Sequence, residues 1–152
     1  MSEAQMRRKE EDGMCVEEFL QSARESELEI ERMAEMLLRL DARAKRMTAV
    51  YRQSGGGKGD GPEAIWAQLA EQREKLTQRM AEAARQQEAV EAFVARIGQS
   101  RYREMLRMRF LSYLTIEEAA ERMGYSYDAG KRLSAQAMRA ARAIWEAEHA
   151  AE

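Results

Sequence analysis

Two long stretches of the chain repeat apolar residues at alternating spacings of three and four. The first consists of Val16, Phe19, Ala23, Ser26, Ile30, Met33, Leu37, Leu40, Ala44, Met47 and Tyr51. The second consists of Trp66, Leu69, Arg73, Leu76, Met80, Ala83, Gln87, Val90, Val94 and Ile97, with an arginine and a glutamine as polar interruptions. Alternation of three and four is the heptad pattern of a coiled-coil helix, whose apolar stripe faces a partner helix. The pattern predicts two long helices.

The segment between these stretches, SGGGKGDGP at residues 54–62, is rich in glycine. Its five glycines do not sustain a helix, and Pro62 suits the first turn of a new one. Two helices of similar length joined by a flexible loop predict an antiparallel hairpin over residues 14–98. A hairpin buries only one narrow stripe per helix, so we expect a partner, with a homodimer through the hairpin favoured. Residues 1–13 are charged and aperiodic and predict a disordered tail.

The last third of the chain, residues 99–152, carries the signals of a helix-turn-helix domain. After a helix that begins near Ser100, Thr115 and Glu118 form a T-x-x-E capping box for a short helix over residues 116–123. Gly124 stops that helix, and Ser126 caps a last helix over residues 127–145. Two capped helices separated by a glycine turn are typical of a helix-turn-helix.

The composition narrows the fold class and the kinds of site. Ala, Leu, Met, Glu, Gln and Arg dominate and β-branched residues are few, which predicts an all-α protein. One cysteine and one histidine leave no disulfide within the chain and no zinc cluster, so we expect no metal and no cofactor. No apolar stretch resembles a signal peptide or a membrane span, which predicts a cytoplasmic protein without membrane contact.

The distribution of charge points to a DNA-binding surface on the last helix. The formal net charge of −2 excludes a globally basic coat, yet the segment from Arg122 to Arg142 holds five basic residues and one acid. We expect Lys131, Arg139 and Arg142 to contact phosphates, together with the helix N-termini at Thr115 and Ser126. Residues near the start of a recognition helix reach base edges in the major groove, and here these are Tyr127, Asp128, Arg132 and Gln136.

A family resemblance agrees with this interpretation. Residues 101–140 resemble region 4 of bacterial sigma factors in an L-R-x-R lead-in, an E-E-A-A helix, a G-Y-S turn and a K-R-L-x-x-x-A-M run. The whole layout resembles small phage regulators of the ArpU and RinA type, in which a hairpin precedes such a module. The resemblance implies promoter binding in a phage or prophage context, inside a bacterial host cell, with RNA polymerase as a further partner.

Two residues depart from the pattern of that family. Gly130 stands where this kind of helix usually carries Val or Ile, and Ala119 stands where Ile or Leu is common. Both are smaller than the usual residue. The contact between the two helices is therefore expected to be thinly filled.

The sequence as a whole predicts a sequence-specific double-stranded DNA-binding transcription regulator with helix 127–145 in the major groove. The resemblance implies that it regulates late genes of a phage or prophage. One alternative is a protein-interaction module that binds RNA polymerase without recognising DNA. Another is a small-terminase-like DNA-packaging subunit. An enzyme is not expected, because the sequence shows no nucleophile–base pair, and GGGKGDG lacks the G-x-x-x-x-G-K-[ST] spacing of a phosphate loop.

Overall fold

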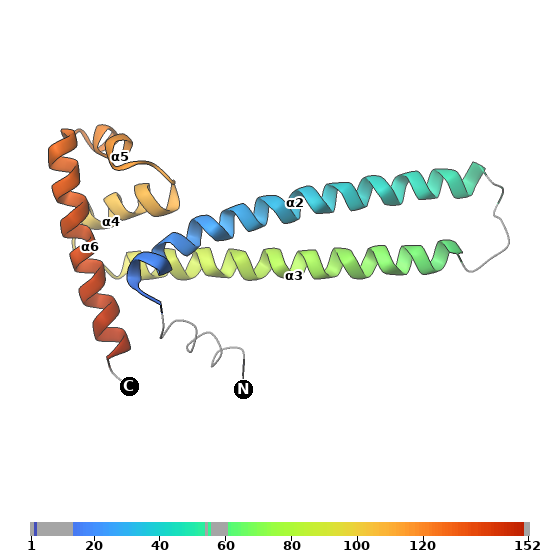
Figure 1. Ribbon diagram of the computed structural model, residues 1–152, viewed down its shortest axis with the longest axis horizontal. Coiled ribbons are helices and arrows are strands. Elements are labelled where there is room, and N and C mark those ends of the chain that lie inside the picture. Colours follow the sequence, from blue (N-terminus) through green and yellow to red (C-terminus); the bar gives the residue numbers. More distant parts are fainter. Residues whose placement is uncertain (1, 3–13, 54, 56–60, 151–152) are drawn as a thin grey trace. The chain divides into compact units, whose positions relative to one another are not determined.

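Helices make up all the regular structure that the computed structural model describes, which comprises residues 2, 14–53, 55 and 61–150 (Figure 1). The elements are α2 (Val16–Gln53), α3 (Gly61–Ala95), α4 (Ser100–Leu106), a π-helical turn (Arg107–Leu111), α5 (Ile116–Met123) and α6 (Tyr127–His149). The all-α class and the two long helices are confirmed. The predicted disordered tail, apart from Ser2, and most of the predicted loop at 54–62 lie outside the described residues. None of the described helices is long and apolar enough to cross a membrane.

The chain divides into two compact units, which we call the helical-pair unit and the C-terminal unit. The helical-pair unit comprises residues 26–85, and the C-terminal unit comprises residues 1–25 together with 86–152. The predicted domain boundary at residue 98 therefore does not coincide with the division of the folded chain. The beginning of α2 and the end of α3 belong to the C-terminal unit because they share its core.

The helical-pair unit is an antiparallel pair with a narrow buried seam, as the heptad pattern predicts. Met33, Leu69, Leu76 and Ala83 are buried at seam positions. Arg73, a polar interruption, is not left unpaired, because its guanidinium donates to the carboxylate of Asp41 on the opposite helix. Near the ends of α2 and α3 that adjoin the loop, Tyr51 and Trp66 meet edge to face with ring centroids 5.8 Å apart.

The C-terminal unit buries a wider face of α2 and α3 than the heptad seam accounts for. Leu20 and Phe93 lie outside the predicted seam, yet both are fully buried. They are covered because the core of this unit also takes in side chains from α4, the π-helical turn and α6. At its centre the Trp145 ring lies 4.9 Å from that of Phe19 and 5.8 Å from that of Phe93, centroid to centroid.

The connection between the π-helical turn and α5 is anchored on α2 and α3. Tyr113 has a φ of 60°, an uncommon conformation for a residue other than glycine. Its hydroxyl donates to the carbonyl of Ala23 at 3.3 Å and accepts from the amide of Gln87 at 3.3 Å, while Arg24 lies over its ring. Gln87, the second polar interruption of the seam, thus has partners. These tertiary contacts hold the unusual backbone in place.

Candidate nucleic-acid interface

The caps and the turn between α5 and α6 have the geometry that the sequence predicts. The Thr115 hydroxyl accepts from the backbone N–H of Glu118 at 3.2 Å, and the Glu118 carboxylate accepts from the backbone N–H of Thr115 at 3.3 Å. Gly124 adopts the left-handed conformation, with a φ of 77°, that stops α5. The Ser126 hydroxyl accepts from the N–H of Ala129 at 3.2 Å and caps α6. The local signals are therefore confirmed.

The contact between α5 and α6 is close rather than thinly filled, which makes the expectation for Gly130 wrong. Gly130 is buried, and a Cβ placed on it would lie 2.4 Å from the Cβ of Ala120. No cavity exists there for a larger side chain to fill. The two helices approach so closely at this point because both residues are small.

A small hydrophobic core joins α5 and α6 to α4. It consists of the fully buried Met105 and Ala119 and of Leu133, with Tyr102, Met108 and Met123 packed against it. Met105 and Leu133 belong to the same buried cluster as Ala119, so the small side chain at position 119 is fully covered. Tyr125 lies in the turn between the two helices and is exposed, so it does not contribute to this core.

A polar contact that sequence reasoning missed also joins α6 to the preceding elements. The guanidinium of Arg109, on the π-helical turn, donates to the hydroxyl of the buried Ser134 at 2.7 Å. Burial lowers the pKa of Arg109 from its ordinary value. The available signal was Ser134 itself, a hydroxyl on the otherwise apolar face of an amphipathic helix. Arg109 is consequently a structural cation rather than part of the outward face.

All nine residues predicted to contact DNA are exposed. Seven belong to α6, whereas Thr115 and Ser126 cap α5 and α6 and use their hydroxyls within the chain. On α6 the spacing of Asp128, Arg132 and Arg139 places them on the face opposite the buried Leu133 and Ala137. Lys131 lies over the ring of Tyr127, with its Nζ 4.5 Å from the centroid. We call Tyr127, Asp128, Lys131, Arg132, Gln136 and Arg139 the outward face of α6.

The cations of the predicted site differ in their ionic partners. Lys131, Arg132 and Arg139 form no ion pair with any carboxylate in the described part of the chain. Arg142 instead donates to the carboxylate of Glu17 at the start of α2. The Arg142 guanidinium holds the pKa of Glu17 below its ordinary value. Arg142 thus has an intramolecular partner 125 residues away, and only opening of this pair would release it for a phosphate.

The Glu17–Arg142 pair predicts a pH-dependent contribution to stability. Because folding lowers the pKa of Glu17, the pair stabilises the fold above the unfolded pKa of about 4.3, and this contribution disappears as the pH falls through the folded pKa. We expect Glu17→Gln to lower the melting temperature slightly at pH 7 and to match the unsubstituted protein at strongly acidic pH. Thermal unfolding of both proteins, measured from pH 7 to strongly acidic pH, gives this difference in melting temperature.

Glu18 provides the matched control, since it is exposed and lies outside the ion pair. We expect Glu18→Gln to show a smaller difference at pH 7. A Glu17→Gln difference that persists unchanged in acid would show that the ion pair is not its cause.

The described residues contain no group of three or more His, Cys, Asp or Glu side chains that could hold a metal ion. Comparison with curated proteins and with solved structures found no significant match. One family model does match, over residues 44–141, a range that takes in all of α3 and extends into α6. Since this range is more than half of the chain, the protein belongs to the family described as "Protein of unknown function (DUF1492)".

Proposed function

We propose that the protein is a sequence-specific double-stranded DNA-binding transcription regulator that inserts α6 into the major groove. The observation that carries the proposal is the outward face of α6. It is exposed along its length, and its three cations have no carboxylate partner among the described residues. An α-helix fits the width of the major groove, and unpaired cations on it favour the phosphates on either side.

Each residue of the outward face has a chemistry that suits one kind of DNA contact. Lys131 and Arg139 supply charge to phosphates, while the planar guanidinium of Arg132 suits two-point hydrogen bonding to guanine. Gln136 matches adenine, and Asp128 can accept from the amino group of cytosine. The packing of α6 on α4 and α5 keeps these side chains on a rigid helix, which lowers the entropy lost on binding.

The regulatory context comes from the sequence resemblance. Residues 101–140 resemble sigma-factor region 4, and the order of hairpin and C-terminal module resembles the ArpU and RinA type of phage regulator. We therefore propose promoter binding in a phage or prophage, in a bacterial host, as a homodimer. Leu28 and Leu38 of α2 favour a partner for the helical pair, since 48% and 70% of their surfaces are exposed.

Selection of fragments from a random DNA pool, followed by binding measurements on the selected duplex, tests the proposal. We expect the combined Lys131→Ala, Arg132→Ala and Arg139→Ala variant to lose at least about 100-fold in affinity, and Arg132→Ala alone to cost roughly 1–3 kcal/mol. If four phosphates are neutralised per monomer, log K falls with log salt at a slope of about −4 for one monomer and about −8 for the proposed homodimer, and the triple variant flattens this slope.

A second triple variant, Lys45→Ala, Arg52→Ala and Arg85→Ala, is the matched control. It removes the same charge from exposed positions of the helical-pair unit. Equal losses in both variants would show attraction by net charge alone and would overturn the assignment to α6. Retention of RNA polymerase without any selected DNA would instead indicate the interaction module. A ring-sized mass in light scattering would indicate the packaging subunit.

A further inference from the structure

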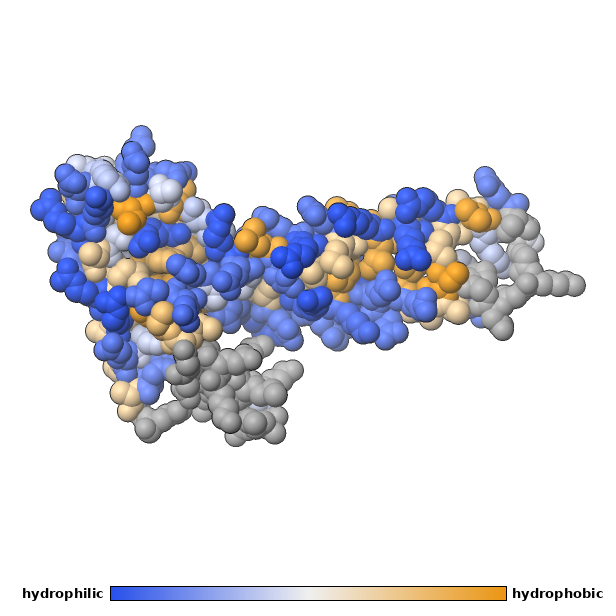
Figure 2. All heavy atoms as spheres, in the orientation of Figure 1, coloured by the Kyte–Doolittle hydropathy of each residue, from blue (hydrophilic) through white to orange (hydrophobic). Residues whose placement is uncertain are grey.

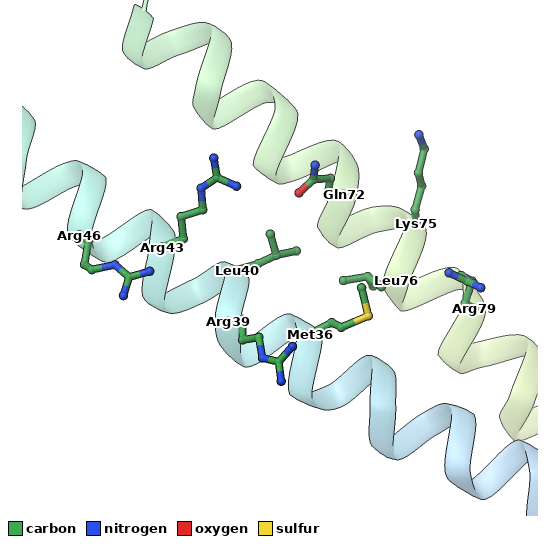
Figure 3. Close-up of a pocket in the computed structure, with 9 residues that line it drawn as sticks. All are labelled: Met36, Arg39, Leu40, Arg43, Arg46, Gln72, Lys75, Leu76 and Arg79. Atoms are coloured by element: carbon green, nitrogen blue, oxygen red, sulfur yellow. The ribbon is translucent and has the colours of Figure 1, made fainter.

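A groove lies between α2 and α3 within the helical-pair unit (Figure 3). Its volume is about 590 Å³, and nine residues line it: Met36, Arg39, Leu40, Arg43, Arg46, Gln72, Lys75, Leu76 and Arg79. None of the residues of the outward face of α6 contributes to it. The groove is thus a second candidate site, in a different compact unit.

The floor of the groove is apolar. Met36, Leu40 and Leu76 point toward one another between the two helices (Figure 3). The heptad seam is too narrow to cover them completely: Leu76 is buried, Leu40 is partly buried and Met36 is 38% exposed. Figure 2 shows apolar surface among hydrophilic side chains along this helical pair. Methionine adapts to different apolar partners, which suits a floor that receives another chain.

The rim of the groove is cationic. Five of the nine lining residues are Lys or Arg and none is acidic, in a chain whose net charge is −2. Lys75 and Arg79 have partners, at 3.3 Å from Glu71 and 3.5 Å from Glu29. The remaining rim cations, on α2, pair with no described carboxylate; they are Arg39, Arg43 and Arg46.

These three arginines follow one another at spacings of four and three residues. Such a spacing places them on one face of α2, where they line the same side of the groove. Like charges at these spacings repel one another, which destabilises the helix of the isolated protein. Carboxylates at helical spacing on a partner would relieve that repulsion. Charge complementarity therefore specifies an anionic occupant.

We propose that this groove binds an acidic amphipathic helix of a partner protein. Leucine-like side chains of that helix bury the floor formed by Met36, Leu40 and Leu76, and its flanking carboxylates pair with the arginines of α2. A nucleic-acid backbone would neutralise the arginines but would leave the apolar floor in water, which makes it the poorer match. From Met36 to Arg46 the groove follows α2 for about 15 Å, so about three helical turns of the partner cover it.

A designed peptide tests this binding mode on the full-length protein. The probe is a fluorescein-labelled helix of about 18 residues, with leucines repeating every three and four positions and glutamates beside them. We expect anisotropy titration to show binding that weakens about tenfold or more with Arg43→Glu. Lys45→Glu is the matched control, because Lys45 is an exposed cation two residues away that does not line the groove. It should change the affinity less than about twofold.

The apolar floor has its own pair of variants. Met36→Gln should weaken binding of the peptide about fivefold, whereas Val50→Gln, at an exposed position outside the groove, should leave the affinity unchanged. Replacing the leucines of the peptide by alanine should abolish binding. Because both positions are exposed, circular dichroism of the variants should match that of the unsubstituted protein.

Several outcomes would overturn the groove as a helix-binding site. These are no binding of the peptide, equal weakening by Arg43→Glu and Lys45→Glu, or binding that is indifferent to the peptide's leucines. Weakened DNA binding by Arg43→Glu with unchanged peptide binding would identify the groove as a phosphate-binding surface instead. The DNA-binding proposal stands or falls separately, since it is tested by variants of α6.

Discussion

Replacing Trp145 by alanine is expected to lower the free energy of unfolding of the C-terminal unit by about 3–5 kcal/mol. Trp145 is 8% exposed and contacts the rings of Phe19 and Phe93, which come from α2 and α3. The His149 ring stacks on that of Trp145, with the ring centroids 3.9 Å apart. Removing the indole leaves a cavity at the point where three distant segments meet, and rigid neighbours cannot fill it.

The second tryptophan supplies the control for this prediction. Trp66 is 36% exposed in the helical-pair unit and has Tyr51 as its aromatic neighbour. We expect Trp66→Ala to cost about 2 kcal/mol, less than Trp145→Ala, because 36% of the Trp66 surface is already exposed to solvent and a smaller apolar area loses its packing. Urea denaturation, followed by far-ultraviolet circular dichroism, measures the free energy of unfolding of both variants. Equal effects of the two substitutions would contradict the central place of Trp145 in the core.

A fragment that contains only the last third of the chain would lack part of the core around Trp145. A fragment limited to residues 99–152, the predicted C-terminal domain, would lack Phe19 and Phe93 and would expose Trp145. Its α6 would also lose the ion pair between Arg142 and Glu17. DNA binding is therefore best measured with the full chain.

The second large effect is expected at Gly130. Replacing a glycine within a helix by alanine ordinarily raises the free energy of unfolding of the protein by about 1 kcal/mol. Here the new Cβ would lie 2.4 Å from the Cβ of Ala120, a short side chain that cannot move aside without its helix. We expect Gly130→Ala to lower the free energy of unfolding by about 1–3 kcal/mol, because α5 and α6 must separate.

A compensating substitution distinguishes this steric cause from any other. In the double variant Ala120→Gly and Gly130→Ala, the methyl group moves from position 120 to position 130. Its nearest neighbour is then the Cα at position 120, at 3.5 Å. We expect the double variant to recover part of the loss despite a second glycine in a helix. Gly98→Ala is the control, since nothing lies within 4 Å of its added Cβ. Stabilisation by Gly130→Ala alone would refute the close contact.

The sequence by itself determined the features that depend on neighbouring residues. Thr115, Glu118, Gly124 and Ser126 act within one or two turns of the chain, so their caps and turn were predictable from spacing alone. The heptad repeats determined the long helices and the seam of the helical-pair unit in the same way. The exposed outward face of α6 followed from the helical period.

Only the tertiary structure decided which distant segments share a core and which cations find partners. Glu17 and Arg142 are 125 residues apart, and Leu20 and Phe93 are buried by helices that no local pattern connects to them. The close approach at Gly130 and the open groove beside Met36 depend on distances between helices. Periodicity specifies the direction in which a side chain points along its own helix. What it meets there depends on how the helices pack.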